Sequence, residues 1–97
     1  MNKTYIPSPI DTSSIAALPE EVRPLLEMLA KNTHENYVKM RIEAGWSYGP
    51  RSDVEKTNPT LIPYEDLSEE EKDCDRVVSN EVLKTILALG YQISRRE

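Results

Sequence analysis

The sequence predicts a single, mainly helical domain, and three observations lead to that prediction. The chain has 97 residues, which is enough for one domain but too few for two. Apolar residues recur at helical spacing in two stretches, and each stretch ends at a glycine. Between them, residues 45–64 contain two glycines and three prolines, which exclude a long helix there.

Residues 1–17 are expected to form an extended arm. Pro7 and Pro9 fix their own φ angles and push the preceding residues out of the helical region. The Asp-Thr-Ser-Ser run that follows is typical of a turn or a helix cap. We expect the apolar side chains of the arm to pin it to the core: Tyr5, Ile6 and Ile10.

The first helix is predicted over about residues 19–44. Pro19 suits a first helical turn, the two glutamates after it suit the positive end of the helix dipole, and Gly45 is a natural end. The spacing also permits two helices that meet near Asn32-Thr33. Its apolar stripe is Val22, Leu26, Leu29, Thr33 and Met40, with Leu25 beside it.

The connection that follows is irregular, with short extended pieces predicted at 46–48 and 60–62. A second helix is predicted over 69–89, because Ser68 and Glu71 form a capping box and Gly90 closes the helix. Its predicted buried face is Val78, Val82, Ile86 and Leu89, widened by Val77, Leu83 and Leu87. Tyr91 and Ile93 are expected to pack back onto it.

Composition narrows the possible functions. The formal net charge is −5, which argues against general nucleic-acid binding because that needs many basic residues against phosphate. No apolar run is long enough to span a bilayer and the start does not resemble a signal peptide, so we expect no membrane insertion. One cysteine, Cys74, permits no internal disulfide. These features together favour a soluble, cytoplasmic protein.

The sequence lacks the motifs of known enzyme classes. There is no phosphate-binding glycine loop and no Gly-x-Ser-x-Gly turn, and one histidine with one cysteine cannot supply the usual zinc cluster. A thiol–imidazole pair of His34 with Cys74 is disfavoured, because the acidic turn around Cys74 raises a thiol pKa. The acidic run over 65–75 is typical of a solvated helix start, with metal binding as the minor alternative. We therefore expect no enzyme activity, catalytic residue, metal or cofactor.

Three polar side chains of the first helix form the strongest candidate site. His34, Tyr37 and Arg41 lie within about 60° of one another on one helix face, with apolar residues on both sides. Covered polar groups need partners, and a covered arginine needs an anion or several carbonyls. Either Arg41 pairs with a local acid and His34 bonds to the backbone, or the face lines a ligand pocket. Trp46 and Tyr48 follow directly, as core residues or as a stacking surface for a planar ligand.

Several segments resemble the ryanodine receptor repeat, the RyR domain. Residues 30–38, Ala-Lys-Asn-Thr-His-Glu-Asn-Tyr-Val, resemble its A-E-N-x-H-x-x-W-A segment, and 41–49 resemble its R-I-x-x-G-W-x-Y-G. Residues 58–64 are similar to its N-P-x-L-V-P-Y, and 83–91 to its closing L-x-x-L-L-x-L-G-Y. The resemblance covers about 5–93. Tyr37 departs from it, since the receptor repeats usually carry tryptophan there.

The resemblance implies a peripheral module rather than a channel. In the giant calcium channels these repeats occur as cytoplasmic tandem pairs outside the pore, and similar prokaryotic domains resemble nucleotide-sensing modules. It implies a cleft between the long helix and the following loops. The residues carried over to this cleft are His34, Tyr37, Arg41, Trp46 and Tyr48, with Lys56 and Asn58 at its rim.

We therefore expect a freestanding binding module for a nucleotide or another planar anionic small molecule. In that interpretation Arg41 and Lys56 meet phosphate, while Tyr37 and Trp46 stack on the base. The alternative is a protein-interaction or scaffold module that uses the same aromatic cleft. The chain is expected to be a monomer or, by self-association of a single copy, a homodimer.

Overall fold

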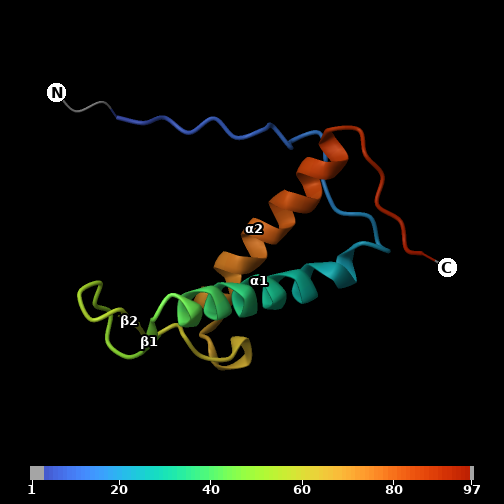
Figure 1. Cartoon of the computed structure of the whole chain (residues 1–97). Coiled ribbons are helices and arrows are strands. Elements are labelled where there is room, and N and C mark those ends of the chain that lie inside the picture. Colours follow the sequence, from blue (N-terminus) through green and yellow to red (C-terminus); the bar gives the residue numbers. More distant parts are fainter. Residues whose placement is uncertain (1–3, 97) are drawn as a thin grey trace.

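The computed structural model describes residues 4–96, and it confirms a mainly helical fold with short extended pieces. The elements follow in the order α1 (Arg23–Glu43), β1 (Ser47–Tyr48), β2 (Thr57–Asn58), the 3-10 helix η1 (Tyr64–Asp66) and α2 (Glu69–Ala88). Figure 1 shows α2 crossing α1 steeply, with the two strands near the C-terminal end of α1. The 3-10 helix η1 packs against the N-terminal half and middle of α1, through Glu27, Ala30 and Lys31. None of the described helices is long and apolar enough to cross a membrane.

The first helix is continuous, but it begins later than predicted. Residues 20–22 form turns, in which the Val22 and Arg23 amides donate to the Pro19 carbonyl at 3.0 and 3.2 Å. Pro24, in the first helical turn, has no amide to donate back to residue 20, so the helical ladder cannot extend to Pro19. No break occurs near Asn32-Thr33, which leaves one helix where the sequence permitted two.

Both helices end as the sequence predicted, at a glycine. Gly45 has φ +93° and Gly90 has φ +92°, the left-handed conformation that glycine adopts without a steric penalty. The capping box at the start of α2 is also confirmed. The Glu71 amide donates to Ser68 Oγ at 3.1 Å, and the Ser68 amide donates to Glu71 Oε1 at 2.9 Å.

The two strands form a short parallel pair, with Ser47 beside Thr57 and Tyr48 beside Asn58. The predicted extended piece at 46–48 is confirmed, but the one at 60–62 is wrong, because the strand lies earlier, at 57–58. The reason is local. Asn58 Oδ1 accepts a hydrogen bond from the Thr60 amide at 2.8 Å, which turns the chain directly after the strand.

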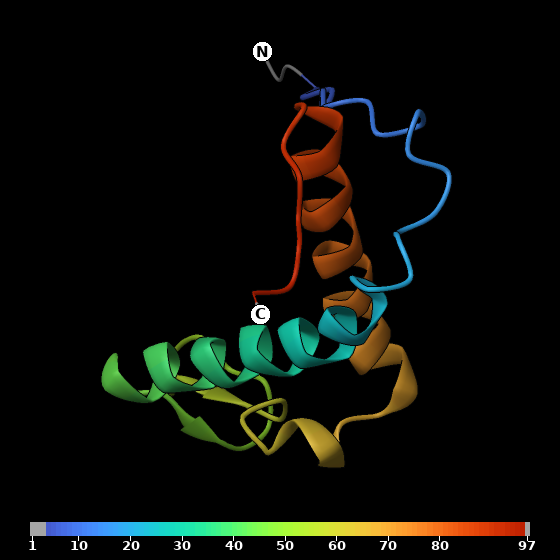
Figure 2. The same cartoon turned by 90° about the vertical axis from the view of Figure 1, so that its right-hand side faces the viewer.

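The core consists of two small clusters. The first is formed by Leu18, Val22 and Leu83, with Leu26, Leu29, Leu87 and Ile93 packed against it. The second joins Ala30 of α1 to Tyr64 and Leu67, with Ile62 against it. The N-terminal part of the predicted α1 stripe is therefore confirmed. Its C-terminal part is wrong, since Thr33 is exposed. Met40 is 68% exposed because the C-terminal end of α1 extends past α2 (Figure 2).

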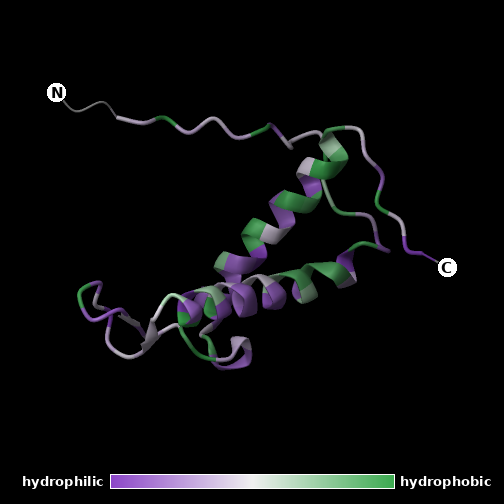
Figure 3. Cartoon of the chain, in the orientation of Figure 1, coloured by the Kyte–Doolittle hydropathy of each residue, from purple (hydrophilic) through white to green (hydrophobic). Residues whose placement is uncertain are grey.

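The predicted buried face of α2 is wrong by about one residue of helical rotation. Val78, Val82 and Leu89 are each more than half exposed, whereas Ser79 and Leu83 are buried. Val77 is exposed as well, while Leu83 and Leu87 pack as expected. Figure 3 shows apolar residues along much of the α2 ribbon, so hydropathy alone does not single out the face that α1 covers.

The tail after α2 packs back on the core, whereas the described part of the N-terminal arm does not. Figure 2 shows the C-terminal tail running back along α2, where Ile93 joins the first cluster as predicted while Tyr91 remains 68% exposed. The arm is extended as expected over residues 4–10, and residues 1–3 lie outside the described residues. Its expected attachment is wrong, because Tyr5, Ile6 and Ile10 are exposed. The hydroxyl of Thr12 contacts α2 instead, donating to the Glu81 carboxylate at 3.1 Å.

A polar network holds η1 against both helices. The Tyr64 hydroxyl donates to Glu27 Oε1 at 2.5 Å, and burial together with this carboxylate raises the pKa of Tyr64 to about 12. Arg76 bonds Glu27 at 2.9 Å and also contacts Glu69 and Asp73. Hydrogen bonds from Arg76 hold the pKa values of Glu27 and Glu69 below their ordinary range.

This network makes the free energy of unfolding depend on pH in the acidic range. Because the folded-state pKa values of Glu27 and Glu69 are lowered, their contribution is present above the ordinary pKa and is lost as the pH falls below about 4.5. We expect Arg76→Gln to flatten the fall in unfolding free energy between about pH 5 and pH 3. Urea unfolding at several pH values measures this. Arg23→Gln, at an exposed pair with Glu20, is the control and should leave the slope unchanged.

Candidate functional site

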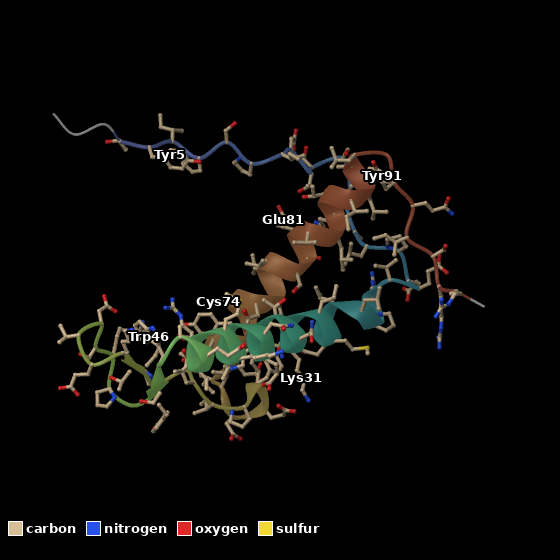
Figure 4. All side chains as sticks on the ribbon, in the orientation of Figure 1. Tyr5, Lys31, Trp46, Cys74, Glu81 and Tyr91 are labelled. Atoms are coloured by element: carbon tan, nitrogen blue, oxygen red, sulfur yellow. The ribbon has the colours of Figure 1, made fainter. Side chains whose placement is uncertain are left out.

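The end of α1 brings three of the predicted site residues together. The Trp46 amide donates to the Arg41 carbonyl at 2.9 Å and the Gly45 amide to the Ile42 carbonyl at 3.0 Å, which is a Schellman motif. This turn folds Trp46 back over the last helical turn. The Arg41 guanidinium then lies 4.7 Å from the centre of the Trp46 ring and 5.3 Å from that of Tyr37. Figure 4 shows Trp46 beside the C-terminal part of α1.

Arg41 is held by aromatic rings rather than by an acid. Its side chain is half-buried, and within residues 4–96 it forms no ion pair. Cation–π contacts hold the guanidinium through its face, so its N–H donors in the plane stay available for an anion. The same contacts occupy one face of Tyr37 and one of Trp46, the two rings that the sequence predicts to stack on a base.

His34 is the buried polar residue at the centre of α1, with 4% of its surface exposed. Its Nε2 lies 2.7 Å from the Ile62 carbonyl, so Nε2 carries the proton in this hydrogen bond. The second nitrogen, Nδ1, lies 4.0 Å from Asp75 Oδ2. One of the two interpretations of this helix face expected a hydrogen bond from His34 to the backbone and an ion pair between Arg41 and a nearby acid. The hydrogen bond is present, whereas within residues 4–96 the ion pair is not.

Asn58 supports the site from β2. It is buried, and its Oδ1 accepts bonds from both the amide and the hydroxyl of Thr60, at 2.8 and 2.7 Å. Its Nδ2 donates to the Tyr37 hydroxyl at 3.5 Å, a long bond. Asn58 therefore positions Tyr37 and the loop, and its Oδ1 with one of its two Nδ2 hydrogens is already used within the fold.

A cavity of about 380 Å³ lies beside these residues, between α1, the start of α2 and the connecting loop. That volume is within the range of small-molecule sites in proteins. His34 and Tyr37 line it from α1. The remaining lining residues come from the loop and α2: Arg51, Thr60, Leu67, Glu71, Cys74 and Asp75, with Thr33 at the end of the α1 wall.

The cavity carries charges of both signs. Burial raises the pKa of Asp75, and the charge of His34 partly offsets that effect. The Ser68 amide lowers the pKa of Glu71, and the positive charges of His34 and Arg51 contribute in the same direction. Two carboxylates on the α2 wall can accept hydrogen bonds from a ligand, while Arg51 can meet an anionic group.

The seven residues predicted for the site do not all lie together. His34 and Tyr37 line the cavity, and Arg41 and Trp46 adjoin it through Tyr37. Tyr48 is 67% exposed on β1, and Lys56 is exposed at a turn with φ +56°. Neither lines the cavity, although the Lys56 carbonyl accepts a bond from the Ser47 amide at 3.0 Å and so shapes the loop.

Sequence reasoning missed the α2 wall. Glu71 and Asp75 belong to the acidic run that the sequence predicts to be a solvated helix start, and Arg51 lies in a charged loop without a motif. The spacing from Glu71 to Asp75 was the available signal, since residues four apart share a helix face. Across residues 4–96, no group of three potential ligands is placed to hold a metal ion.

Two helices that cross steeply, with an open cavity of ligand size between them and the connecting loop, define a small helical module. The RyR domain family model matches residues 5–95 of this chain. The chain therefore belongs to the RyR domain family.

Proposed function

We propose that this RyR domain is a non-catalytic binding module for a nucleotide or a similar ligand that joins a polar ring system to an anion. The observation that carries the proposal is the mixed charge of the cavity, whose lining includes Glu71 and Asp75 of α2 together with a basic loop residue, Arg51. Carboxylates suit hydroxyl and amino donors of a sugar or a base, and they repel phosphate.

The proposed orientation of the ligand follows from the positions of these negative and positive side chains. The sugar or base would enter beside His34, Tyr37 and Asp75, where the wall accepts hydrogen bonds. Its phosphate would point toward the positive end of the site, at Arg51 and toward the unpaired fork of Arg41. Because Arg41 lies over one face of Tyr37 and one of Trp46, a stacked base would need the other face of either ring.

The rate at which Cys74 is alkylated can report ligand binding, because Cys74 is the only cysteine, is exposed and lines the cavity. We expect a bound nucleotide to slow alkylation of Cys74 and to raise the melting temperature by about 5 °C or more at tenfold its Kd. Adenosine and inorganic phosphate, tested separately, show which half of the ligand binds. If no linear or cyclic nucleotide has either effect at millimolar concentration, the proposal is wrong.

Two variants locate the ligand within the site. Asp75→Asn should weaken binding of the nucleoside part, whereas Arg51→Gln should weaken only phosphate-bearing ligands. Arg95→Gln, in the exposed tail, is the matched control and should change neither. Equal loss of adenosine and nucleotide binding in Arg51→Gln would contradict the proposed orientation.

A peptide is the second candidate, and the same carboxylates favour it. Glu71 and Asp75 would hold a lysine or arginine side chain of a partner chain as well as they hold a sugar. In that case a lysine-containing peptide, and no nucleotide, would protect Cys74 from alkylation.

A further inference from the structure

The face of α2 that points away from α1 carries an apolar groove that no segment of residues 4–96 covers. Val77, Val78 and Val82 are 63%, 56% and 51% exposed, although valine side chains are normally buried in folded domains. Together with Thr85 and Ile86 they line a shallow groove of about 430 Å³. Among the described residues, Glu81 is the one charged residue that lines this groove.

The N-terminal arm is the second unpartnered apolar surface. Tyr5, Ile6 and Ile10 are 82%, 81% and 53% exposed. Pro7 and Pro9 keep the segment extended and remove two amide donors, which suits a strand-like ligand for an apolar groove. Figure 4 shows Tyr5 on the arm, clear of both helices.

The arm is attached at the edge of the α2 groove. The Thr12 hydroxyl donates to the Glu81 carboxylate at 3.1 and 3.2 Å, and Glu81 is itself a groove residue. From this attachment the arm runs outward and does not cover the groove (Figure 1). Seven extended residues reach about 20 Å, which is enough to cross to a neighbouring molecule.

We propose that two copies of this chain form a symmetric dimer by exchanging arms, so that each arm lies in the α2 groove of the other copy. In a two-fold symmetric pair, each arm covers one groove, so both apolar surfaces are buried and none is left to bind a third copy. Each of the exposed apolar side chains offers roughly 100 Å², so two arms and two grooves together approach the ~1,200–2,000 Å² that specific interfaces bury.

The charge distribution permits this contact despite a net charge of −5 on each chain. Residues 4–10 contain no charged residue, and the single carboxylate of the groove already accepts a hydrogen bond from Thr12. The acidic residues of 65–75 lie at the other end of α2 from the arm, and salt screens repulsion over such distances.

Sedimentation of the full chain at tens of micromolar tests the proposal. We expect a species of twice the 11.1 kDa chain mass. Ile6→Asp in the arm and Val78→Asp in the groove should each weaken association at least tenfold. Val54→Asp is the matched control, since Val54 is 94% exposed in the loop and lies outside both surfaces. Circular dichroism checks that each variant remains folded, as expected for exposed positions.

Mixing the two variants distinguishes exchanged arms from direct pairing of α2 helices. In a mixed pair, the intact arm of the Val78→Asp chain meets the intact groove of the Ile6→Asp chain. The mixture should therefore associate more strongly than either variant alone. A single species near the chain mass for the unchanged protein overturns the proposal. A dimer that Ile6→Asp leaves unaffected overturns it as well.

Discussion

Leu83→Ala is expected to lower the free energy of unfolding by about 2–5 kcal/mol. Leu83 is 4% exposed and packs with Leu18 and Val22 where the two helices and the N-terminal segment meet. A domain of this size has a stability of about 5–15 kcal/mol at most, so the loss is a large fraction of the total. Urea unfolding followed by circular dichroism measures the change.

Leu89→Ala is the matched control, because it makes the same chemical change at the C-cap of the same helix, at a position that is 58% exposed. It should cost less than about 1 kcal/mol. The pair of variants distinguishes the observed face of α2 from the one predicted by periodicity. A larger loss at Leu89 than at Leu83 would contradict the packing described above.

Arg41→Ala is expected to weaken nucleotide binding by about tenfold to a hundredfold, while the apo protein keeps most of its stability. A hydrogen bond to a charged group contributes about 1.5–3 kcal/mol, which corresponds to that range. Cation–π contacts at partly exposed sites contribute only about 0.5–1 kcal/mol each, so their loss costs little stability. Titration calorimetry and thermal unfolding of the same variant measure the two quantities.

Two further variants sharpen this prediction. Arg41→Lys keeps the charge but loses the planar fork, so binding should recover only in part. Lys39→Ala removes a neighbouring exposed charge from the same helix and should leave the affinity unchanged. Destabilisation of the apo Arg41→Ala protein by several kcal/mol would instead assign Arg41 a structural role.

The sequence predicted the helix ends more accurately than the helix faces. Gly45, Gly90 and the Ser68–Glu71 capping box act through local hydrogen bonds, which depend on residues close in the chain. The buried face of α2 depends on where α1 crosses it, which is a tertiary property. Because both sides of α2 carry apolar residues, periodicity selected Val78 and Val82, whereas the fold buries Ser79 and Leu83.

The candidate site was predicted in part, for the same reason. The helix period alone placed His34, Tyr37 and Arg41 on one face. The α2 wall of Glu71 and Asp75 comes from a segment more than thirty residues away, and only the fold brings it to His34. The long connection contributes Arg51 and Thr60, and the path of that loop across the cavity is a tertiary property that local sequence does not specify.

The capping box at the start of α2 also bears on how a ligand would be received. Glu71 closes that box with Oε1, and the same side chain lines the cavity. Its rotamer is therefore fixed when the helix forms, before any ligand arrives. The conformational entropy that a free glutamate would lose on binding has already been lost in folding, so this wall of the cavity is preorganised.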